Sequence, residues 1–262
     1  MKRIILTLFV LALSNYVHAV VLYDGSQNST PDTQGWLYIA DSSQATQTAS
    51  GSVTVLDTTS STDIKAGYFS QDPSLLSGYE HPGMTGITLD RNAGYTLSFA
   101  MRLNSENHLN PDRAGFSVIV LSNDLMGIEL GFWQNEIWAQ SGFPHDQQLF
   151  RHAEGTVGFD TTGFLINYDL QVLGGTYTLF ADNIQVLTGN VRDYSGFIDP
   201  LGTHHPYDIP DFMFFGDNTS SAGANIDLAY IELNTNAVPE PSAIVLFGVG
   251  VFGLLKKLKR NK

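Results

Sequence analysis

The feature that most constrains the fold is a regular alternation of apolar and polar residues between positions 95 and 103. Every second residue is apolar there, in the order Tyr95, Leu97, Phe99, Met101 and Leu103. Successive side chains of an extended strand point to opposite faces of its sheet. The segment therefore predicts a β-strand that buries one face against a core.

Similar patterns recur at short intervals, separated by residues that favour turns. They cover 35–40, 52–57, 64–69, 95–103, 115–121, 127–133, 136–140, 164–172, 176–181, 184–188, 211–215 and 224–233. Gly174-Gly175 and Asp182-Asn183 predict two consecutive hairpins. Because the strands show no repeat of fixed length, we expect an all-β fold: an antiparallel two-sheet sandwich of the jelly-roll kind.

The C-terminal end combines three elements in a fixed order. Pro239-Glu240-Pro241 precedes an apolar run over 243–255, and five Lys and Arg residues follow within 256–262. Proline cannot continue a helix, so the tripeptide should stay extended. Positive charge favours the cytoplasmic side of a membrane. Spanning a bilayer takes about 20 apolar residues, so 243–258 is expected to form a short transmembrane helix.

These three elements resemble the PEP-CTERM sorting signal that exosortases recognise in Gram-negative bacteria. The resemblance covers 238–262. It implies an exosortase as partner, transient anchoring in the inner membrane, cleavage near the tripeptide, and delivery to the cell surface or extracellular matrix. The alternative is a simple C-terminal membrane anchor.

The N-terminus agrees with export. Lys2 and Arg3 precede an apolar stretch over 4–13, and Val17-His18-Ala19 forms a small-residue cleavage site. We therefore expect a Sec signal peptide that is removed after Ala19. The expected order is the signal peptide over 1–19, a β-sandwich domain over 20–233, a linker over 234–237 and the sorting signal over 238–262.

The exported body is strongly acidic and has no cysteine. Between residues 20 and 238, six Lys and Arg stand against 25 Asp and Glu, a formal charge of −19. Nucleic-acid binding needs clustered Lys and Arg to neutralise phosphates, so nucleic acid is excluded as a partner. The charge fits an extracellular protein that either binds cations or stays dispersed by repulsion. Without disulfides, its stability must come from core burial.

Consecutive strands in the body resemble those of concanavalin/laminin-G-like sandwiches. They lie at 113–121, 127–133 and 136–140, and the segment 214–222 with the closing strand 224–233 is also similar. Together with the sorting signal, the body resembles the choice-of-anchor domains that precede PEP-CTERM tails, most nearly choice-of-anchor Y. Sandwiches of this group often bind sugars on a concave face lined by aromatic and polar side chains.

Trp133 and Trp138 are the candidates for stacking on a sugar ring. The turn at 134–135 should place Trp138 opposite Gly131, so that both indoles project from one face of the sheet. The alternative is that both rings belong to the core. Charged residues that flank these strands are candidates for a polar sugar-binding rim: Arg113, Arg151, His152 and Glu154. Of these, His152 and Glu154 are expected on the same strand face.

Calcium is a candidate cofactor, and no other cofactor is expected. Hard cations take several oxygen ligands, and four such residues lie close in sequence: Asp208, Asp211, Asp217 and Asn218. No calcium-loop motif accompanies them.

A catalytic site is weakly indicated. Retaining glycosidases place two carboxylates about 5–5.5 Å apart, whereas Glu129 stands alone on its strand and Glu136 lies beyond a turn. We therefore expect a non-enzymatic surface or matrix protein that associates with exopolysaccharide or another glycan. The alternative is a glycan-degrading hydrolase on a concanavalin-like sandwich.

Overall fold

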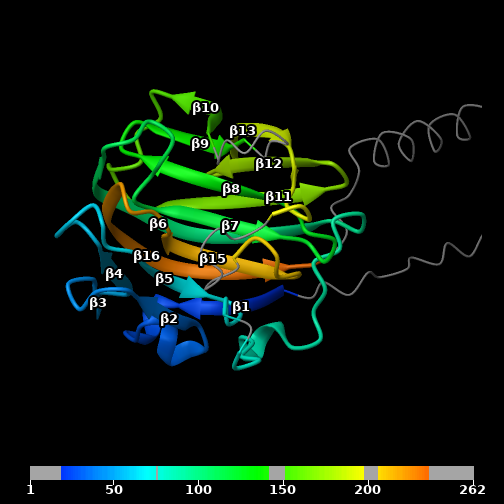
Figure 1. The fold of residues 1–262 in the computed structure, drawn as a ribbon, viewed down its shortest axis with the longest axis horizontal. Coiled ribbons are helices and arrows are strands. Elements are labelled where there is room, and N and C mark those ends of the chain that lie inside the picture. The colour runs from blue at the N-terminus through cyan, green and yellow to red at the C-terminus, as the bar shows by residue number, and fades with distance from the viewer. Residues whose placement is uncertain (1–18, 75, 142–150, 198–205, 236–262) are drawn as a thin grey trace, which may run out of the picture.

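The computed structural model describes residues 19–74, 76–141, 151–197 and 206–235, which fold almost entirely as β-strands (Figure 1). Three short 3₁₀ helices are η1 (Gly25–Gln27), η2 (Pro31–Gln34) and η3 (Pro82–Met84). The strands are β1 (Ala19–Asp24), β2 (Leu37–Ala40), β3 (Thr46–Ser50), β4 (Val53–Asp57), β5 (Ala66–Phe69), β6 (Tyr95–His108), β7 (Ser117–Leu121), β8 (Met126–Trp133), β9 (Glu136–Gln140), β10 (His152–Val157), β11 (Ile166–Leu173), β12 (Thr176–Ala181), β13 (Ile184–Asn190), β14 (Arg192–Asp193), β15 (Phe212–Asp217) and β16 (Ala222–Asn234).

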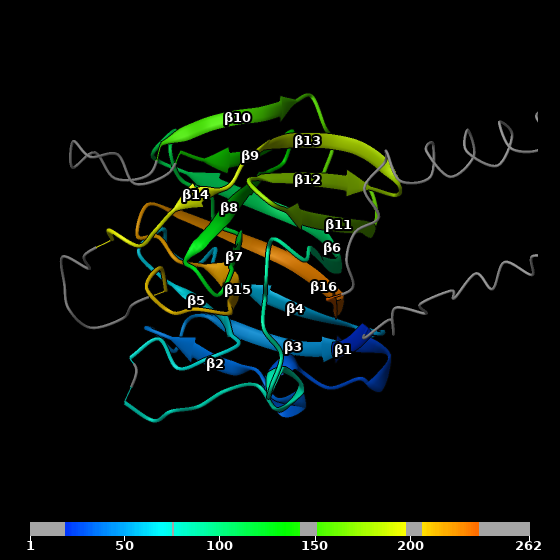
Figure 2. The same ribbon diagram turned by 90° about the vertical axis from the view of Figure 1, so that its right-hand side faces the viewer.

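The strands pair into two antiparallel sheets that pack face to face, as the edge-on view in Figure 2 shows. Sheet A has the order β13-β12-β11-β6-β16-β4-β3, with β1 paired to β16. Sheet B has the order β10-β9-β8-β7-β15-β5-β2, with β14 paired to β8. The predicted all-β, antiparallel two-sheet sandwich is confirmed.

The apolar residues that alternate along β6 lie at the centre of the core. Leu97, Phe99 and Met101 are fully buried, because this face of sheet A meets the inner face of sheet B. The Phe99 ring lies edge-on to two sheet B rings, with its centroid 6.1 Å from that of Phe132 and 5.5 Å from that of Phe215. Edge-to-face pairs of this kind add to the stability that burial alone provides.

Both predicted hairpins are present. Leu173 pairs with Thr176 around Gly174-Gly175, and Asp182 and Asn183 take positive φ angles of 46° and 67° between β12 and β13. Asn and Asp tolerate this left-handed conformation. The strands without a sequence prediction are β1, β3 and β14, and β10 was expected only through the strand face assigned to His152 and Glu154. Of these, β3 reads Thr-Gln-Thr-Ala-Ser and lies at a sheet edge, so it has no apolar face to reveal it.

The two ends of the sandwich lie side by side. Ala19, the first residue of β1, pairs with Asn234, the last residue of β16. The strand β16 thus extends by one residue into the predicted linker. The predicted signal peptide before Ala19 and the predicted span 243–258 lie outside the described residues. Within the described ranges, no helix is long and apolar enough to cross a membrane.

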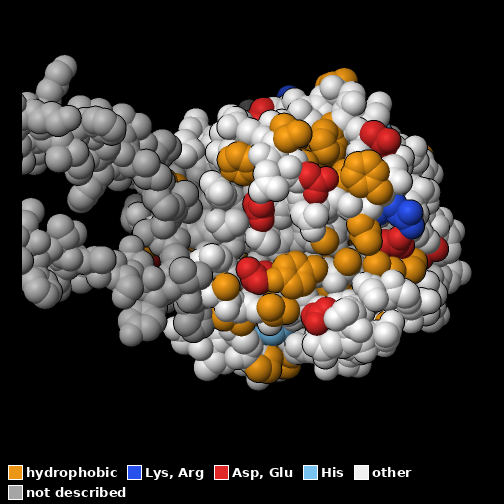
Figure 3. Space-filling model, turned by 180° about the vertical axis from the view of Figure 1, so that it is seen from behind, with side chains coloured by type: hydrophobic (Ala, Val, Ile, Leu, Met, Phe, Trp, Pro, Cys, Tyr) orange, Lys and Arg blue, Asp and Glu red, His pale blue; other side chains and the backbone are white. Residues whose placement is uncertain are grey.

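The outward face of sheet A is seen in Figure 3. Its side chains are a mixture of apolar and uncharged polar groups with scattered carboxylates, and Lys and Arg are sparse. The ion pair between Arg102 and Asp227 spans β6 and β16 of this sheet, with Nη2 and Oδ2 2.5 Å apart. Sheet B carries the features that follow.

Candidate functional site

Glycines shape the outward face of sheet B. Strand pairing places four small residues in one row across β5, β15, β7 and β8: Gly67, Gly216, Ser117 and Gly131. Aromatic rings lie directly over two of these positions. A Cβ added to Gly67 would lie 2.4 Å from Cε2 of Phe214, and one added to Gly131 would lie 2.6 Å from Cε2 of Trp138. The small residues therefore allow rings to approach the sheet closely.

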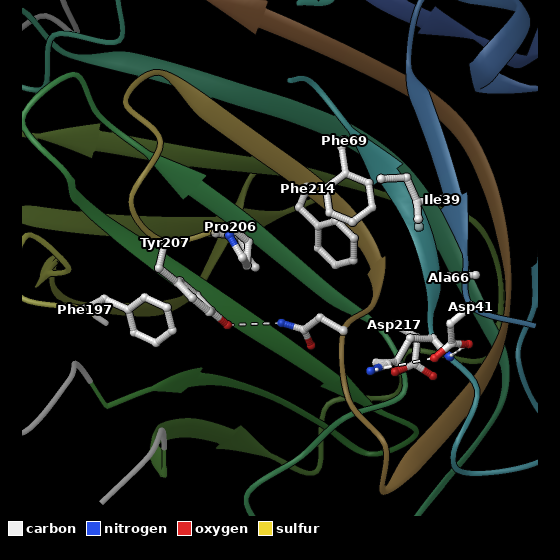
Figure 4. Close-up of a pocket in the computed structure, with 13 residues that line it drawn as sticks. Ile39, Asp41, Ala66, Phe69, Phe197, Pro206, Tyr207, Phe214 and Asp217 are labelled. Carbon is white, nitrogen blue, oxygen red and sulfur yellow. Dashed lines mark hydrogen bonds and ion pairs between the residues drawn. The ribbon is translucent and has the colours of Figure 1, made fainter. Parts of the chain in front are cut away.

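A pocket of about 270 Å³ opens on this face (Figure 4). Most of its wall is apolar and comes from six residues: Ile39, Phe69, Ile119, Phe197, Pro206 and Phe214. Polar groups lie at its two ends: Tyr207 at one, and Asp41 and Asp217 at the other. The rings of Phe69 and Phe214 lie between these ends. This volume is near the lower end for ligand pockets, so it suits a small ligand or one unit of a polymer.

Glu129 on β8 fixes the first polar end. The Tyr207 hydroxyl donates to its Oε2 at 2.5 Å, and Asn218 Nδ2 donates to its Oε1 at 3.0 Å. Asn218 Nδ2 also lies 3.1 Å from the Tyr207 hydroxyl oxygen. Glu129 is fully buried, and this burial raises the pKa of its carboxyl. Because Tyr207 and Asn218 line the pocket, Glu129 holds both in place.

Asp217 at the end of β15 forms the second polar end. It is 2% exposed, and its carboxyl accepts the Thr58 hydroxyl at 2.8 Å and the Thr219 N–H at 3.0 Å. Burial raises the pKa of Asp217 to about 8. The negative charge of Asp41 acts in the same direction, and the positive charge of Lys65 opposes it. Lys65 Nζ lies 3.7 Å from Asp41 Oδ2.

The predicted placement of the two tryptophans holds, and they differ in exposure: Trp138 is enclosed, whereas Trp133 is partly exposed. Trp133 pairs with Glu136 and Trp138 with Gly131, so both indoles lie on the outward face with ring centroids 5.5 Å apart. Trp138 is fully buried. It therefore has no ring face to offer a sugar, although it belongs to neither interior cluster of apolar residues.

Trp133 is covered on both sides by imidazole rings. His108 stacks at a centroid distance of 4.2 Å and an interplanar angle of 7°, and His152 stacks at 5.1 Å and 10°. The indole Nε1 donates to the carbonyl oxygen of Arg113 at 2.9 Å. The ring thus stacks on histidines from β6 and β10, and it remains partly exposed where it lines a second, open pocket with His108 and Gln134.

The expected alignment of His152 and Glu154 on one strand face is wrong, because the pairing register shifts inside β10. His152 Nε2 lies 3.0 Å from Glu136 Oε1. Glu154 instead accepts two hydrogen bonds from Arg192 Nη2 at 2.7 Å and one from the Tyr177 hydroxyl at 2.8 Å. The two side chains therefore have separate partners and do not form an acid–base pair.

Neither of the other two rim candidates lines the pocket. Arg113 Nη1 donates to the carbonyl oxygen of Asp112 at 2.6 Å, and its positive charge acts on the Glu129 carboxyl. Arg151 is exposed, and its backbone N–H donates to Ser141 Oγ at 3.0 Å.

The predicted calcium ligands are engaged separately. Asp211 Oδ1 accepts the Leu89 N–H at 2.6 Å, whereas Asp217 and Asn218 hold the partners given above. Asp208 is described but does not line the pocket. In the part of the chain that the structure covers, no three His, Asp or Glu side chains gather into a set that could hold a metal. The four residues do not form a calcium site in this arrangement.

Sequence reasoning named two of the lining residues, Asp217 and Asn218, only as calcium ligands, and it missed the others. Two missed residues carry a signal: Lys65, which lines the pocket, and Glu129, which holds Tyr207 and Asn218. Lys65 is the only lysine between residues 20 and 255, which marks it as unusual. Glu129 is a lone charge inside the apolar strand Gly127-Ile128-Glu129-Leu130-Gly131, and a buried charge needs dedicated partners. Tyr207 carries no such signal, because only the fold places it opposite Glu129.

Comparison with known proteins identifies the tail and the fold. Residues 237–260 match the PEP-CTERM protein-sorting motif, and Pro239, Glu240 and Pro241 lie inside this match, outside the described residues. The motif indicates export and membrane-anchored sorting by an exosortase in Gram-negative bacteria. No curated protein matches the chain.

A solved structure with a TM-score above 0.5 shares the fold at low sequence identity. The carbohydrate esterase vb_24B_21 from the Shiga toxin-encoding bacteriophage phi24B is 10% identical, with a TM-score of 0.52 over 84% of this chain and 99% of that one. Alginate lyase A1-II', a member of polysaccharide lyase family 7, is 11% identical, with a TM-score of 0.40 over 82% of this chain and 92% of that one. The chain thus combines a two-sheet β-sandwich with a PEP-CTERM protein-sorting motif.

Proposed function

We propose that this protein is an exported surface or matrix protein that binds exopolysaccharide or another glycan in the pocket on sheet B, without cleaving it. A Sec signal peptide that ends at Ala19 would start export. The segment 243–258 would hold the chain in the inner membrane until an exosortase acts near Pro239-Glu240-Pro241. The match of residues 237–260 to the sorting motif supports this route.

The arrangement of the pocket is the observation that carries glycan binding. A sugar ring has an apolar face of C–H groups and a rim of hydroxyls. The rings of Phe69 and Phe214 provide an apolar surface, with centroids 4.7 Å apart. Tyr207 and Asn218 at one end, with Asp41 and Asp217 at the other, provide hydrogen-bonding groups for hydroxyls. Small ligands are commonly bound in this way, with a few polar groups placed in an apolar pocket.

The burial and the hydrogen bonds of Glu129 favour glycan binding over glycan hydrolysis. Glu129 has the raised pKa of a general acid, because it is buried. Glu129 does not line the pocket, and its two oxygens accept hydrogen bonds from Tyr207 and Asn218, which do. A glycosidase needs two carboxylates that reach the sugar. Glu129 is therefore assigned a positioning role.

A glycan array probed with the full-length chain in mild detergent tests the proposal. Phe69→Leu keeps an apolar side chain but removes the ring, so binding should fall at least tenfold. Phe164→Leu makes the same change at a residue that is 63% exposed and outside the pocket, so binding should stay unchanged. No binding to any glycan, or equal binding by both variants, would overturn the assignment of this pocket.

Hydrolysis is tested on the same glycans by measuring new reducing ends. The proposal expects none above the level of a heat-denatured sample. Release that is lost in Glu129→Gln would make the protein a hydrolase instead.

A further inference from the structure

The charges at the acidic end of the pocket are unbalanced. Asp41 and Asp217 both line it, and Lys65 is the only Lys or Arg among the described lining residues. Lys65 pairs with Asp41 at 3.7 Å, where both side chains are more than 40% exposed. Asp217 is instead held by the neutral donors Thr58 and Thr219. Once Asp217 ionises, this end has two carboxylates and one ammonium, and one further cation would neutralise it.

The walls next to this end also favour a cation. The rings of Phe69 and Phe214 line the same pocket as the carboxyl groups of Asp41 and Asp217. Aromatic faces attract ammonium groups through their quadrupole. Across the exported body, the formal charge of −19 produces a field that concentrates cations and repels anions near the surface. Uronic acids and sulfated sugars are therefore disfavoured ligands.

We propose that the pocket selects a sugar unit with a free amino group, and that its ammonium lies between Asp217 and Asp41 while its ring packs on Phe69 and Phe214. This inference rests on the proposed function and specifies the class of glycan. A hexosamine polymer that has lost its acetyl groups has the required chemistry. The N-acetylated form lacks the charge and adds a bulky amide, and a glucose polymer has only a hydroxyl at that position.

Binding of such a unit should release a proton. The groups that face Asp217 are Thr58, Thr219, Asp41 and Lys65, and burial among them raises its pKa to about 8. Below that pH the carboxyl is protonated in the free protein. An ammonium nearby stabilises the ionised form, so its arrival displaces the proton. A neutral sugar does not stabilise the ionised carboxyl, so its binding should release no proton.

The selectivity for an amino sugar can be tested with three β-1,4-linked hexamers, of glucosamine, N-acetylglucosamine and glucose. Their sugar units differ only in the group on carbon 2. Titration calorimetry on the full-length chain in detergent, at mildly acidic pH, should show the glucosamine hexamer binding at least tenfold more tightly than the other two. Repeating the titration in buffers of different ionisation enthalpy should reveal proton release with glucosamine only.

Variants assign the effect to this end of the pocket. Asp217→Asn should reduce glucosamine binding at least tenfold and abolish proton release. Asp41→Asn changes a partly exposed side chain, so it tests the site without disturbing the interior, and it should also weaken binding. Glu80→Gln removes one negative charge from an exposed residue that does not line the pocket. It controls for the overall charge and should leave affinity unchanged.

The outcomes distinguish the two proposals. Equal binding of the three hexamers, or unchanged glucosamine binding in both pocket variants, would overturn the amino-sugar inference and leave glycan binding in place. Equal weakening in Glu80→Gln would reduce the effect to overall charge and also overturn it. If no hexamer binds but other glycans on the array do, only the inference fails. If nothing binds at all, both proposals fail.

Discussion

Gly131 lies directly opposite Trp138 in the antiparallel pair of β8 and β9, and the indole fills the space that a side chain at Gly131 would occupy. A ring also fills this space at Gly67, where it comes from Phe214, the partner of Phe69 in the pair of β15 and β5. Aromatic rings thus lie over two glycines on the outward face of sheet B, and one of them, Phe214, also lines the pocket.

Gly131→Ala should destabilise the protein by about 1–3 kcal/mol, because the new methyl group forces the Trp138 ring out of its position. The measurement is chemical denaturation followed by tryptophan fluorescence. Gly175→Ala is the matched control, since an added Cβ there meets nothing within 4 Å. Equal stability of the two variants would show that the indole does not lie over Gly131.

Trp138→Ala should cost about 3–5 kcal/mol of folding stability, the range for a large buried aromatic side chain. The indole is fully buried, so its removal leaves a cavity over β8. Thermal unfolding followed by circular dichroism measures the loss. A variant that keeps its full stability and loses only glycan binding would contradict the structure and restore the role of Trp138 as a stacking platform.

The stability of the protein should fall as pH rises from about 4 to about 8. Asp217 has a pKa of about 8 in the folded state and an ordinary value of 3.8. Between these values the folded protein holds a proton that the unfolded chain has lost, so raising the pH favours unfolding. The contribution is complete below pH 4 and is lost once the pH passes 8.

Asp217→Asn should remove this part of the pH dependence. The amide oxygen can still accept the Thr219 N–H, and the Thr58 hydroxyl has the Ala224 carbonyl oxygen as another acceptor at 3.3 Å. Melting temperatures of the parent and the variant, recorded from pH 4 to pH 8, give the comparison. Identical slopes would show that Asp217 titrates near its ordinary value.

Replacing Pro239-Glu240-Pro241 with three alanines, or deleting 256–262, should leave the protein uncleaved or mislocalised in a host that has an exosortase. Both changes fall in or overlap the matched sorting motif at 237–260. Cell fractionation and the mass of the surface form provide the measurement. Normal processing after both changes would refute the sorting assignment.

Local pattern was enough to predict the strands that have one apolar face. The alternation in β6, the hairpin around Gly174-Gly175 and the shared face of Trp133 and Trp138 each depend on residues close in sequence, where strand geometry leaves few choices. A strand whose two faces are both polar was not predicted, and β3 at a sheet edge is the example. The order of residues within each strand thus determined the fold class, and the C-terminal tripeptide, apolar run and basic tail determined the export route.

The tertiary structure alone decided the candidate site. Glu129, Tyr207 and Asn218 are up to 89 positions apart and meet only because β8 and the segments around β15 converge on one face of sheet B. A register shift in β10 likewise separated His152 from Glu154. Alternation predicts which way a side chain points, but the partner that it meets depends on strand order and register. These are set by packing of the whole core, which no single segment of the sequence specifies.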